Sequence, residues 1–203
     1  AGKISHQAPY DLVRKMRASV CVLGPLVGRL KQAVVSLPGG CVIGDRPIDL
    51  HLRGLEALGA EVEVKGGDVS VIARDGLRGA EINMRGKHGS TVLGTGNIMM
   101  AAVLAKGQSI IEGAALEPEV IDLANFLNAM GANIEGAGTR TIVIEGVEEL
   151  GGAEHVVIPD RIEAGTFLVA GALAGDDVIL ENVCCAHMTE LINFLRQSGH
   201  QVN

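Results

Sequence analysis

The amino-acid sequence predicts an α/β (α+β) protein assembled from repeated units of about 70 residues. Three segments, residues 48–64, 119–136 and 187–203, each carry apolar residues at helical spacing, then a glycine, then a strand-like alternation. The glycines of successive segments lie 72 and 68 residues apart, a regularity that indicates internal repetition. The third segment stops at Asn203 without the strands that follow the other two. We therefore expect two whole units and part of a third.

Each of the first two segments leads into a predicted pair of strands. In the first, a helix ends at Gly59 and β-branched residues then alternate with turn residues through a strand pair in 69–84. In the second, a helix, a short strand and another helix lead to Gly131, and strands follow in 140–158. Each unit is thus expected to place its helices before a pair of strands.

The helix that opens the second unit has a start rich in small and hydroxyl residues. Ser90 and Thr91 are its predicted cap residues, followed by Gly94, Thr95 and Gly96. Such a helix start suits phosphate oxygens, because unpaired N–H groups and the helix dipole face the ligand. A plain cap with close helix packing is the simpler interpretation of the same residues.

The last predicted helix pair repeats the plan of residues 90–119. Asp160 and Glu163 have the spacing of a capping box, which places a helix start near Arg161. A short strand is predicted at 178–182, before the final helix that ends at Gly199.

Composition argues against several classes of protein. The chain has 203 residues, 47% of them hydrophobic, and a net charge of −7, which suits one or two globular domains. One Tyr, three Phe, no Trp and the lack of a basic run disfavour nucleic-acid binding. No apolar run reaches the length of about 18 residues that would predict a membrane span, and the first residues lack the pattern of a signal peptide.

The four cysteines predict reduced thiols and a cytoplasmic protein. Cys21, Cys41, Cys184 and Cys185 fit neither a disulfide framework nor a paired metal site. Cys184, Cys185 and His187 are metal-ligating residue types, but adjacent cysteines rarely reach one ion in good geometry, so we expect ordinary packing there. The sequence therefore predicts no metal and no cofactor.

Cys41 stands in an unusual place, among glycines and prolines in "LPGGCVIGDRP". Arg46 and Arg17 are candidates for lowering the thiol pKa or for holding an anion beside it. This combination suits a thiol on a movable loop that exchanges a proton with a small anionic substrate. An ordinary surface turn that carries a cysteine is an equally good interpretation of the local sequence.

Other polar residues favour structural roles. Glu117, Glu119 and Asp122 occur at the start of a predicted helix, where carboxylates stabilise the helix dipole. His51 is expected to make a structural hydrogen bond, although a role in orienting the cysteine loop is the alternative.

The stretches "PGGCVIGDRPIDLHLRGLEALGA" and "PDRIEAGTFLVAGAL" resemble the UDP-N-acetylglucosamine enolpyruvyl transferases, the MurA family. The resemblance runs from about Ala8 to the end of the chain. It implies two domains, each an inside-out α/β barrel of three repeated units, with helices buried and sheets outside. It further implies that residues 1–157 are the later two units of the catalytic domain and residues 158–203 a truncated opening unit of the second domain. The barrel is then incomplete.

The resemblance also implies a reaction, the first committed step of peptidoglycan synthesis. The enolpyruvyl group of phosphoenolpyruvate passes to the 3-hydroxyl of UDP-N-acetylglucosamine with release of phosphate. Addition followed by elimination needs a proton donor and cations around an anionic adduct. Cys41 takes the position of the catalytic loop cysteine, and Arg17 and Arg46 those of phosphoenolpyruvate or phosphate ligands. The implied UDP-sugar ligands are Arg46, Pro47, Ile48, Asp49, Leu50, Thr91, Val92 and Leu93.

This sequence departs from the family pattern in two ways. The resemblance implies a lysine just before the diphosphate segment, whereas here Lys87 stands four residues before Thr91. The family's Lys-Asn pair, a catalytic Asp and a further anion-binding Arg have no counterpart. We therefore expect a fragment that is inactive alone and that self-associates through its incomplete barrel. A shikimate-phosphate enolpyruvyl transferase is disfavoured because that family lacks the cysteine loop, and a noncatalytic sugar-nucleotide-binding module is the alternative function.

Overall fold

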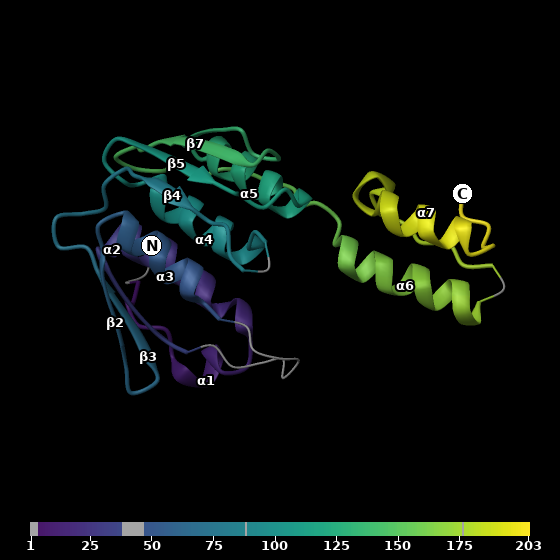
Figure 1. The fold of residues 1–203 in the computed structure, drawn as a ribbon, viewed down its shortest axis with the longest axis horizontal. Coiled ribbons are helices and arrows are strands. Elements are labelled where there is room, and N and C mark those ends of the chain that lie inside the picture. The colour runs from purple at the N-terminus through teal and green to yellow at the C-terminus, as the bar shows by residue number, and fades with distance from the viewer. Residues whose placement is uncertain (1–3, 38–46, 88, 176) are drawn as a thin grey trace. The chain divides into compact units, whose positions relative to one another are not determined.

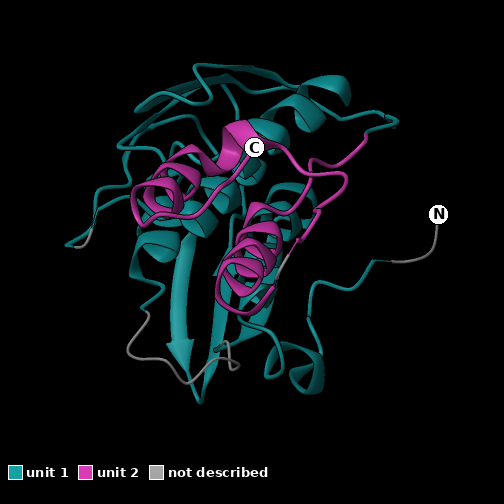
Figure 2. Ribbon diagram, turned by 90° about the vertical axis from the view of Figure 1, so that its right-hand side faces the viewer, with its two compact units in different colours: residues 1–155 teal, residues 156–203 magenta. Residues whose placement is uncertain are grey.

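The computed structural model describes residues 4–37, 47–87, 89–175 and 177–203 (Figure 1). The chain divides into two compact units, unit 1 (Ala1–His155) and unit 2 (Val156–Asn203), which are coloured separately in Figure 2. In the described residues, every helix is too short or too polar to cross a bilayer.

The first half of unit 1 forms a three-stranded antiparallel sheet with helices on it. Its strand order is β1-β3-β2, and Val69 of β3 lies opposite both Val35 of β1 and Val64 of β2. The elements are α1 (Tyr10–Val13), the 3-10 helix η1 (Arg17–Val22), α2 (Leu23–Leu30), β1 (Gln32–Ser36), α3 (Asp49–Ala57), β2 (Glu61–Lys65) and β3 (Asp68–Ile72).

The second half of unit 1 repeats this arrangement. Its strand order is β4-β5-β7-β6, so that β7 lies between β5 and β6 as β3 lies between β1 and β2, with β4 added in parallel beside β5. The succession α4, β5, α5, β6, β7 therefore matches α2, β1, α3, β2, β3, and the predicted repeat is confirmed. The strand pair predicted in 69–84 is wrong as a pair, because β3 joins the first sheet and β4 the second. The elements are β4 (Glu81–Asn83), α4 (Val92–Ala102), β5 (Gln108–Glu112), α5 (Pro118–Ala129), β6 (Asn133–Glu135) and β7 (Thr141–Glu145).

The glycine that ends each repeated helix has a left-handed backbone. Gly59, Gly131 and Gly199 have φ of 88°, 101° and 94° and follow α3, α5 and the last helix of the chain. A Cβ atom makes this conformation costly, so glycine is favoured at the position that stops the helix. The repeat of about 70 residues seen in the sequence is therefore the spacing between successive glycines that end these helices.

Helix α4 is the centre of unit 1. Figure 1 shows α2, α3 and α4 between the two sheets, and α4 contacts η1, α2, α3 and α5. Residues 94–99 are all buried, as expected for a helix that is covered on every side. Small residues permit the close approach: a Cβ on Gly54 of α3 would lie 2.6 Å from the Ile98 side chain, and one on Gly24 of α2 would lie 2.0 Å from the Asn97 carbonyl oxygen.

Unit 2 consists of α6 (Arg161–Ala174), the 3-10 helix η2 (Cys185–Met188) and α7 (Thr189–Gln197). The predicted cap is confirmed, since the Asp160 carboxylate accepts hydrogen bonds from the backbone N–H groups of Ile162 and Glu163. The predicted strand at 178–182 is wrong. A strand needs a neighbouring strand, and the described part of unit 2 contains none, so that the Ile179 side chain is 85% exposed.

The predicted strands in 140–158 are only partly correct. Pairing stops at Glu145, and the backbone N–H groups of Gly146 and Val147 instead donate to the carbonyls of Gly107 and Val103, at 3.1 and 2.8 Å. The chain thus turns toward the end of α4, and residues 146–160 are irregular.

Candidate active site

The sequence-predicted site residues that the structure describes gather at three helix starts in unit 1. Arg17 is the first residue of η1. Cys41 and Arg46, which were also predicted, lie outside the described residues. The remaining candidates are Pro47, Ile48, Asp49 and Leu50 at the start of α3, and Thr91, Val92 and Leu93 at the start of α4.

Arg17 reaches the start of α3 across 30 residues of sequence. Its Nη2 donates to the carbonyl oxygen of Pro47 over a long 3.5 Å contact. Ile48 is buried and anchors the segment, whereas Pro47 and Asp49 on either side are exposed. The guanidinium and these exposed groups therefore lie on one accessible edge of unit 1.

The start of α4 is a tightly built cap. The Thr91 hydroxyl accepts a hydrogen bond from the backbone N–H of Gly94 at 3.1 Å, which confirms Thr91 as the cap residue. A Cβ on Gly94 would lie 2.4 Å from Thr91 Cγ2 and 2.9 Å from Met84 Cε, so glycine permits this packing. Thr91, Val92 and Leu93 are only partly buried, and the first N–H groups of an 11-residue helix can bind an anion.

Asn97 joins the helices that carry these candidates. Its Oδ1 accepts from the Gly24 N–H at 2.7 Å, and its Nδ2 lies 3.2 Å from the Val20 carbonyl oxygen and 3.0 Å from Nδ1 of His51. Asn97 is fully buried and His51 is 4% exposed. Sequence reasoning missed Asn97, although a single amide within the apolar run of α4 was the available signal.

His51 is held in its neutral form. Burial, then the positive charge of Arg17, lower its pKa from 6.5 to about 4, while Asp49 acts in the opposite direction. The predicted structural hydrogen bond of His51 is confirmed by its contact with Asn97. In the same region burial raises the pKa of Cys21 to about 11, and its thiol lies 3.8 Å from the Leu93 carbonyl oxygen.

Arg53 of α3 fixes the backbone that leads toward α4. Its Nη2 donates to the carbonyl oxygens of Asn83 at 2.8 Å and Arg85 at 3.2 Å. Lys87 follows in a turn where the backbone groups of Gly86 and Gly89 bond to each other, and its side chain is exposed. An exposed lysine side chain therefore lies four residues before Thr91, the cap residue of α4.

Of the three carboxylates predicted to stabilise the start of α5, only one does so in the predicted way. Glu117 occupies the cap position but makes no capping hydrogen bond through its side chain. Asp122 binds His155 instead of the helix end, with 2.9 Å between the oxygen and Nε2, and the His155 ring packs on Phe126 with ring centroids 5.1 Å apart. The expectation of a dipole-favoured cap holds for Glu119 as an acid in the first turn.

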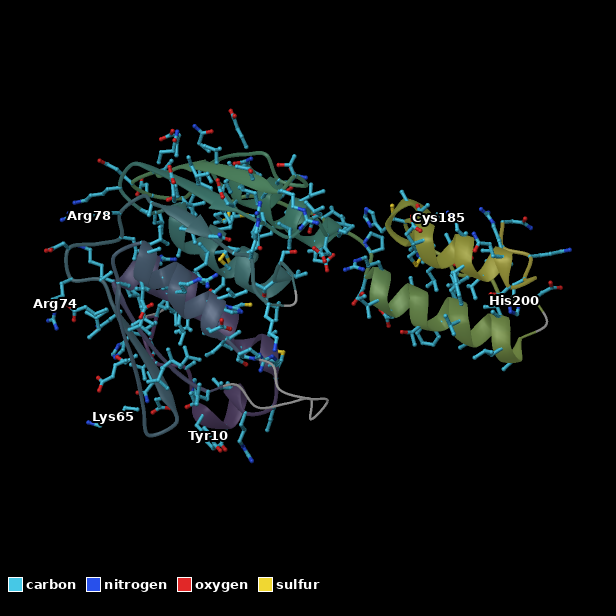
Figure 3. All side chains as sticks on the ribbon, in the orientation of Figure 1. Tyr10, Lys65, Arg74, Arg78, Cys185 and His200 are labelled. Atoms are coloured by element: carbon cyan, nitrogen blue, oxygen red, sulfur yellow. The ribbon has the colours of Figure 1, made fainter. Side chains whose placement is uncertain are left out.

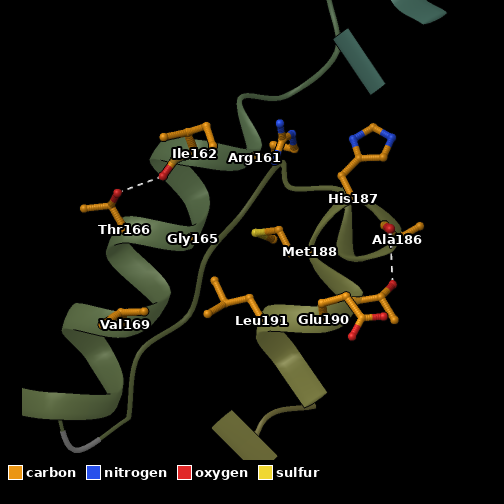
Figure 4. Close-up of a pocket in the computed structure, with 11 residues that line it drawn as sticks. Arg161, Ile162, Gly165, Thr166, Val169, Ala186, His187, Met188, Glu190 and Leu191 are labelled. Atoms are coloured by element: carbon orange, nitrogen blue, oxygen red, sulfur yellow. Dashed lines mark hydrogen bonds between the residues drawn. The ribbon is translucent and has the colours of Figure 1, made fainter. Parts of the chain in front are cut away.

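Two cavities contain none of the sequence-predicted substrate ligands. One in unit 2, of about 860 Å³, lies between α6 and the η2–α7 segment and is lined mainly by apolar or small side chains (Figure 4). Another, of about 330 Å³, lies in unit 1 beside Arg74 and Arg78, both labelled in Figure 3. Arg74 is already paired with Glu61 at 3.4 Å. Across the described ranges, no three His, Cys, Asp or Glu residues cluster closely enough to hold a metal ion.

Comparison with known protein families places the whole chain in one group. The model of the family EPSP synthase (3-phosphoshikimate 1-carboxyvinyltransferase) matches residues 1–203. The chain is 60% identical over 202 residues to the UDP-N-acetylglucosamine 1-carboxyvinyltransferase of Akkermansia muciniphila, covering 100% of this chain and 48% of that protein. It is 59% identical over 202 residues to the enzyme of that name from Methylacidiphilum infernorum, covering 98% and 48%. The chain thus spans about half the length of the curated relatives that it matches.

Solved structures have the same fold. The enolpyruvyl transferase NikO from Streptomyces tendae matches with a TM-score of 0.69 at 28% identity, over 85% of this chain and 40% of that one. The EPSP synthase from Acinetobacter baumannii matches with a TM-score of 0.65 at 25% identity, over 90% and 41%. These matches confirm the predicted inside-out α/β barrel type of fold.

Proposed function

Because the chain belongs to the EPSP synthase family, we propose that it forms part of an enzyme that transfers the enolpyruvyl group of phosphoenolpyruvate to the 3-hydroxyl of UDP-N-acetylglucosamine. Phosphate is released, and the step commits the sugar nucleotide to peptidoglycan synthesis. The observation that carries the proposal is the 60% identity, over the entire chain, to a protein with this activity in its name. The gathering of Arg17 and the starts of α3 and α4 in unit 1 supports it.

The proposed chemistry is addition followed by elimination. The sugar hydroxyl adds to C2 of phosphoenolpyruvate while C3 gains a proton, and C3 then loses a proton as phosphate leaves. Cys41 is the proposed group for proton transfer. Arg17 and Arg46 are proposed to hold the carboxylate and phosphate, because a planar, permanently charged guanidinium matches those oxygens in pairs.

The UDP-sugar is proposed to bind between two helix starts. Residues 46–50 (Arg46, Pro47, Ile48, Asp49 and Leu50) would hold the uracil side. Residues 91–93 (Thr91, Val92 and Leu93) would hold the diphosphate. The capped start of α4 supports the second assignment, since backbone N–H groups and the helix dipole favour phosphate oxygens there.

The two units are proposed to belong to different domains of the whole enzyme. Residues 1–157 would be the later two repeats of the catalytic domain, and residues 158–203 the opening repeat of the other domain. Exposed apolar side chains of unit 2, among them Phe167 at 57% and Phe194 at 64%, support self-association of the isolated chain. We place the reaction in the cytoplasm, in keeping with the free thiols of Cys21, Cys184 and Cys185.

A domain replacement tests the proposal. Residues 1–203 replace the matching segment of the Akkermansia muciniphila relative, and phosphate release is measured with phosphoenolpyruvate and either UDP-N-acetylglucosamine or 3-phosphoshikimate as acceptor. We expect turnover with the sugar nucleotide alone, and its loss in the Cys41→Ala variant. A folded hybrid that is inactive while the chain still binds the sugar nucleotide would support the noncatalytic alternative.

A further inference from the structure

Asn97 makes contacts that differ from those of an ordinary core residue. Each of its polar atoms has a partner, and the partners belong to three other segments: Val20 in η1, Gly24 in α2 and His51 in α3. These partners are 77, 73 and 46 residues away in the sequence. One buried amide thus connects α4 to each neighbouring helix that bears or adjoins a candidate site residue.

The contacts of Asn97 also determine where the proton of His51 lies. Gly24 N–H is a donor, so the atom that faces it at 2.7 Å must be the amide oxygen. The other amide atom is then the NH₂ group, which can only donate, and Nδ1 of His51 must accept. The proton of the neutral ring is therefore on Nε2.

We propose that Asn97 is a positioning residue of the UDP-sugar site, which holds η1 and the first turn of α3 in register with the start of α4. The inference rests on the proposed function and extends it to a residue that acts through His51 and through backbone groups. Arg17 lies three residues before Val20, and Asp49 and Leu50 immediately precede His51. A shift in either contact therefore displaces groups that are proposed to bind substrate.

A purely packing role for this position would not require an amide. The sequence neighbours Gly96 and Ile98 are buried and carry no polar side-chain atom, and leucine branches at Cγ as asparagine does, although it is larger. An amide here instead makes the spacing of three helices depend on directed hydrogen bonds, whose geometry tolerates little displacement. Small errors in the placement of binding groups are costly for enzymes.

Asn128 provides a chemical control. Unlike Asn97 it is exposed, and its side chain connects a helix to backbone six residues away: it donates to the Ile134 carbonyl and accepts from the Ile134 N–H, both at 2.9 Å. These contacts join α5 to β6 and involve no candidate site residue. Asn128→Asp and Asn128→Leu therefore make the same chemical changes as Asn97→Asp and Asn97→Leu without altering the proposed site.

The test measures UDP-N-acetylglucosamine binding by calorimetry and the state of His51 by ¹⁵N nuclear magnetic resonance, on the hybrid enzyme that carries residues 1–203. We expect both Asn97 variants to weaken binding by about tenfold or more, and the Asn128 variants to bind like the parent. In the parent, Nε2 of His51 should carry the proton. In Asn97→Asp the carboxylate faces Nδ1, so that nitrogen should become protonated near neutral pH.

Separate results would refute the two proposals. If the parent does not bind the sugar nucleotide, the proposed function falls and the role of Asn97 falls with it. If the parent binds and the Asn97 variants bind equally well, only the positioning role is refuted, and a parent His51 protonated on Nδ1 also refutes it. Should neither Asn97 variant fold, His51→Gln and His51→Leu replace them: Gln keeps an acceptor for the amide and should bind more tightly than Leu, whereas equal affinities count against the proposal.

Discussion

Acidification should destabilise unit 1 through His51. The ring is buried and neutral, with its pKa lowered from 6.5 to about 4 by burial and by Arg17. In the unfolded chain the ring returns to its ordinary pKa and binds a proton below about pH 6.5. Between these two values the unfolded state binds more protons than the folded state, so stability is lost as the pH falls from about 6.5 to about 4.

The size of the effect follows from the difference between the two pKa values. Each unit corresponds to about 1.4 kcal/mol, so the whole window is worth about 3 kcal/mol, of which about 2 kcal/mol should be lost between about pH 7 and pH 4.5. This is a large fraction of the stability of a typical domain, about 5–15 kcal/mol. Above about pH 7 the contribution of His51 should be constant.

Urea unfolding of the parent and of His51→Gln, each at about pH 7 and pH 4.5, measures this contribution. Gln keeps an acceptor for Asn97 but does not titrate, and all other ionisable groups are common to the two proteins. We expect the parent to lose about 2 kcal/mol more than the variant on acidification. Equal losses in the two proteins would refute the reasoning, as would a resonance of His51 that titrates near its ordinary value.

Four further outcomes are expected. Cys41 should be alkylated before Cys21, because burial raises the pKa of Cys21 to about 11 and leaves it little thiolate. Cys41 should also be the thiol modified by an epoxide phosphonate that resembles phosphoenolpyruvate, and faster labelling of Cys21 in mass mapping would contradict this. Arg46→Lys in the hybrid enzyme should lower turnover about tenfold or more without changing thermal stability, because lysine lacks the planar fork, and unchanged steady-state kinetics would remove Arg46 from the site. In a denaturation assay Gly24→Ala should destabilise the chain by about 3 kcal/mol, because its Cβ would lie 2.0 Å from a carbonyl oxygen of α4. In the same assay Gly28→Ala should be tolerated, because its Cβ would lie 3.4 Å from the nearest atom. The 203-residue chain alone should release no phosphate from the two substrates, because it spans about half the length of its relatives; Cys41-dependent turnover near that of a full-length relative would disprove this.

Local features of the fold were predictable because they depend on neighbouring residues. The left-handed glycines after the helices, the Thr91 cap and the Asp160 cap each express the conformational preference of a few adjacent residues. The strand predicted at 178–182 failed for the opposite reason. Its run of apolar residues, Val178 to Leu180, has strand propensity, but a strand also needs a partner, and the described part of unit 2 provides none.

The candidate site was predictable only in part. The residues at the starts of α3 and α4 were identified from their sequence resemblance, and the structure shows that both helix starts belong to unit 1 with Arg17 beside the first. The roles of these residues remain predictions. Asn97 and the neutral state of His51 were missed, because both depend on burial.

The sequence by itself determined the repeat, the glycine stops and the family, because all of these are encoded in periodicity and in short stretches of residues. The tertiary structure decided which helix ends lie together and which nitrogen of His51 carries the proton. Those outcomes depend on hydrogen bonds between Asn97 and groups 46, 73 and 77 residues away. Such bonds form only when packing has removed water from around α4. The buried side-chain amide of Asn97 can then find hydrogen-bond partners only in the neighbouring helices.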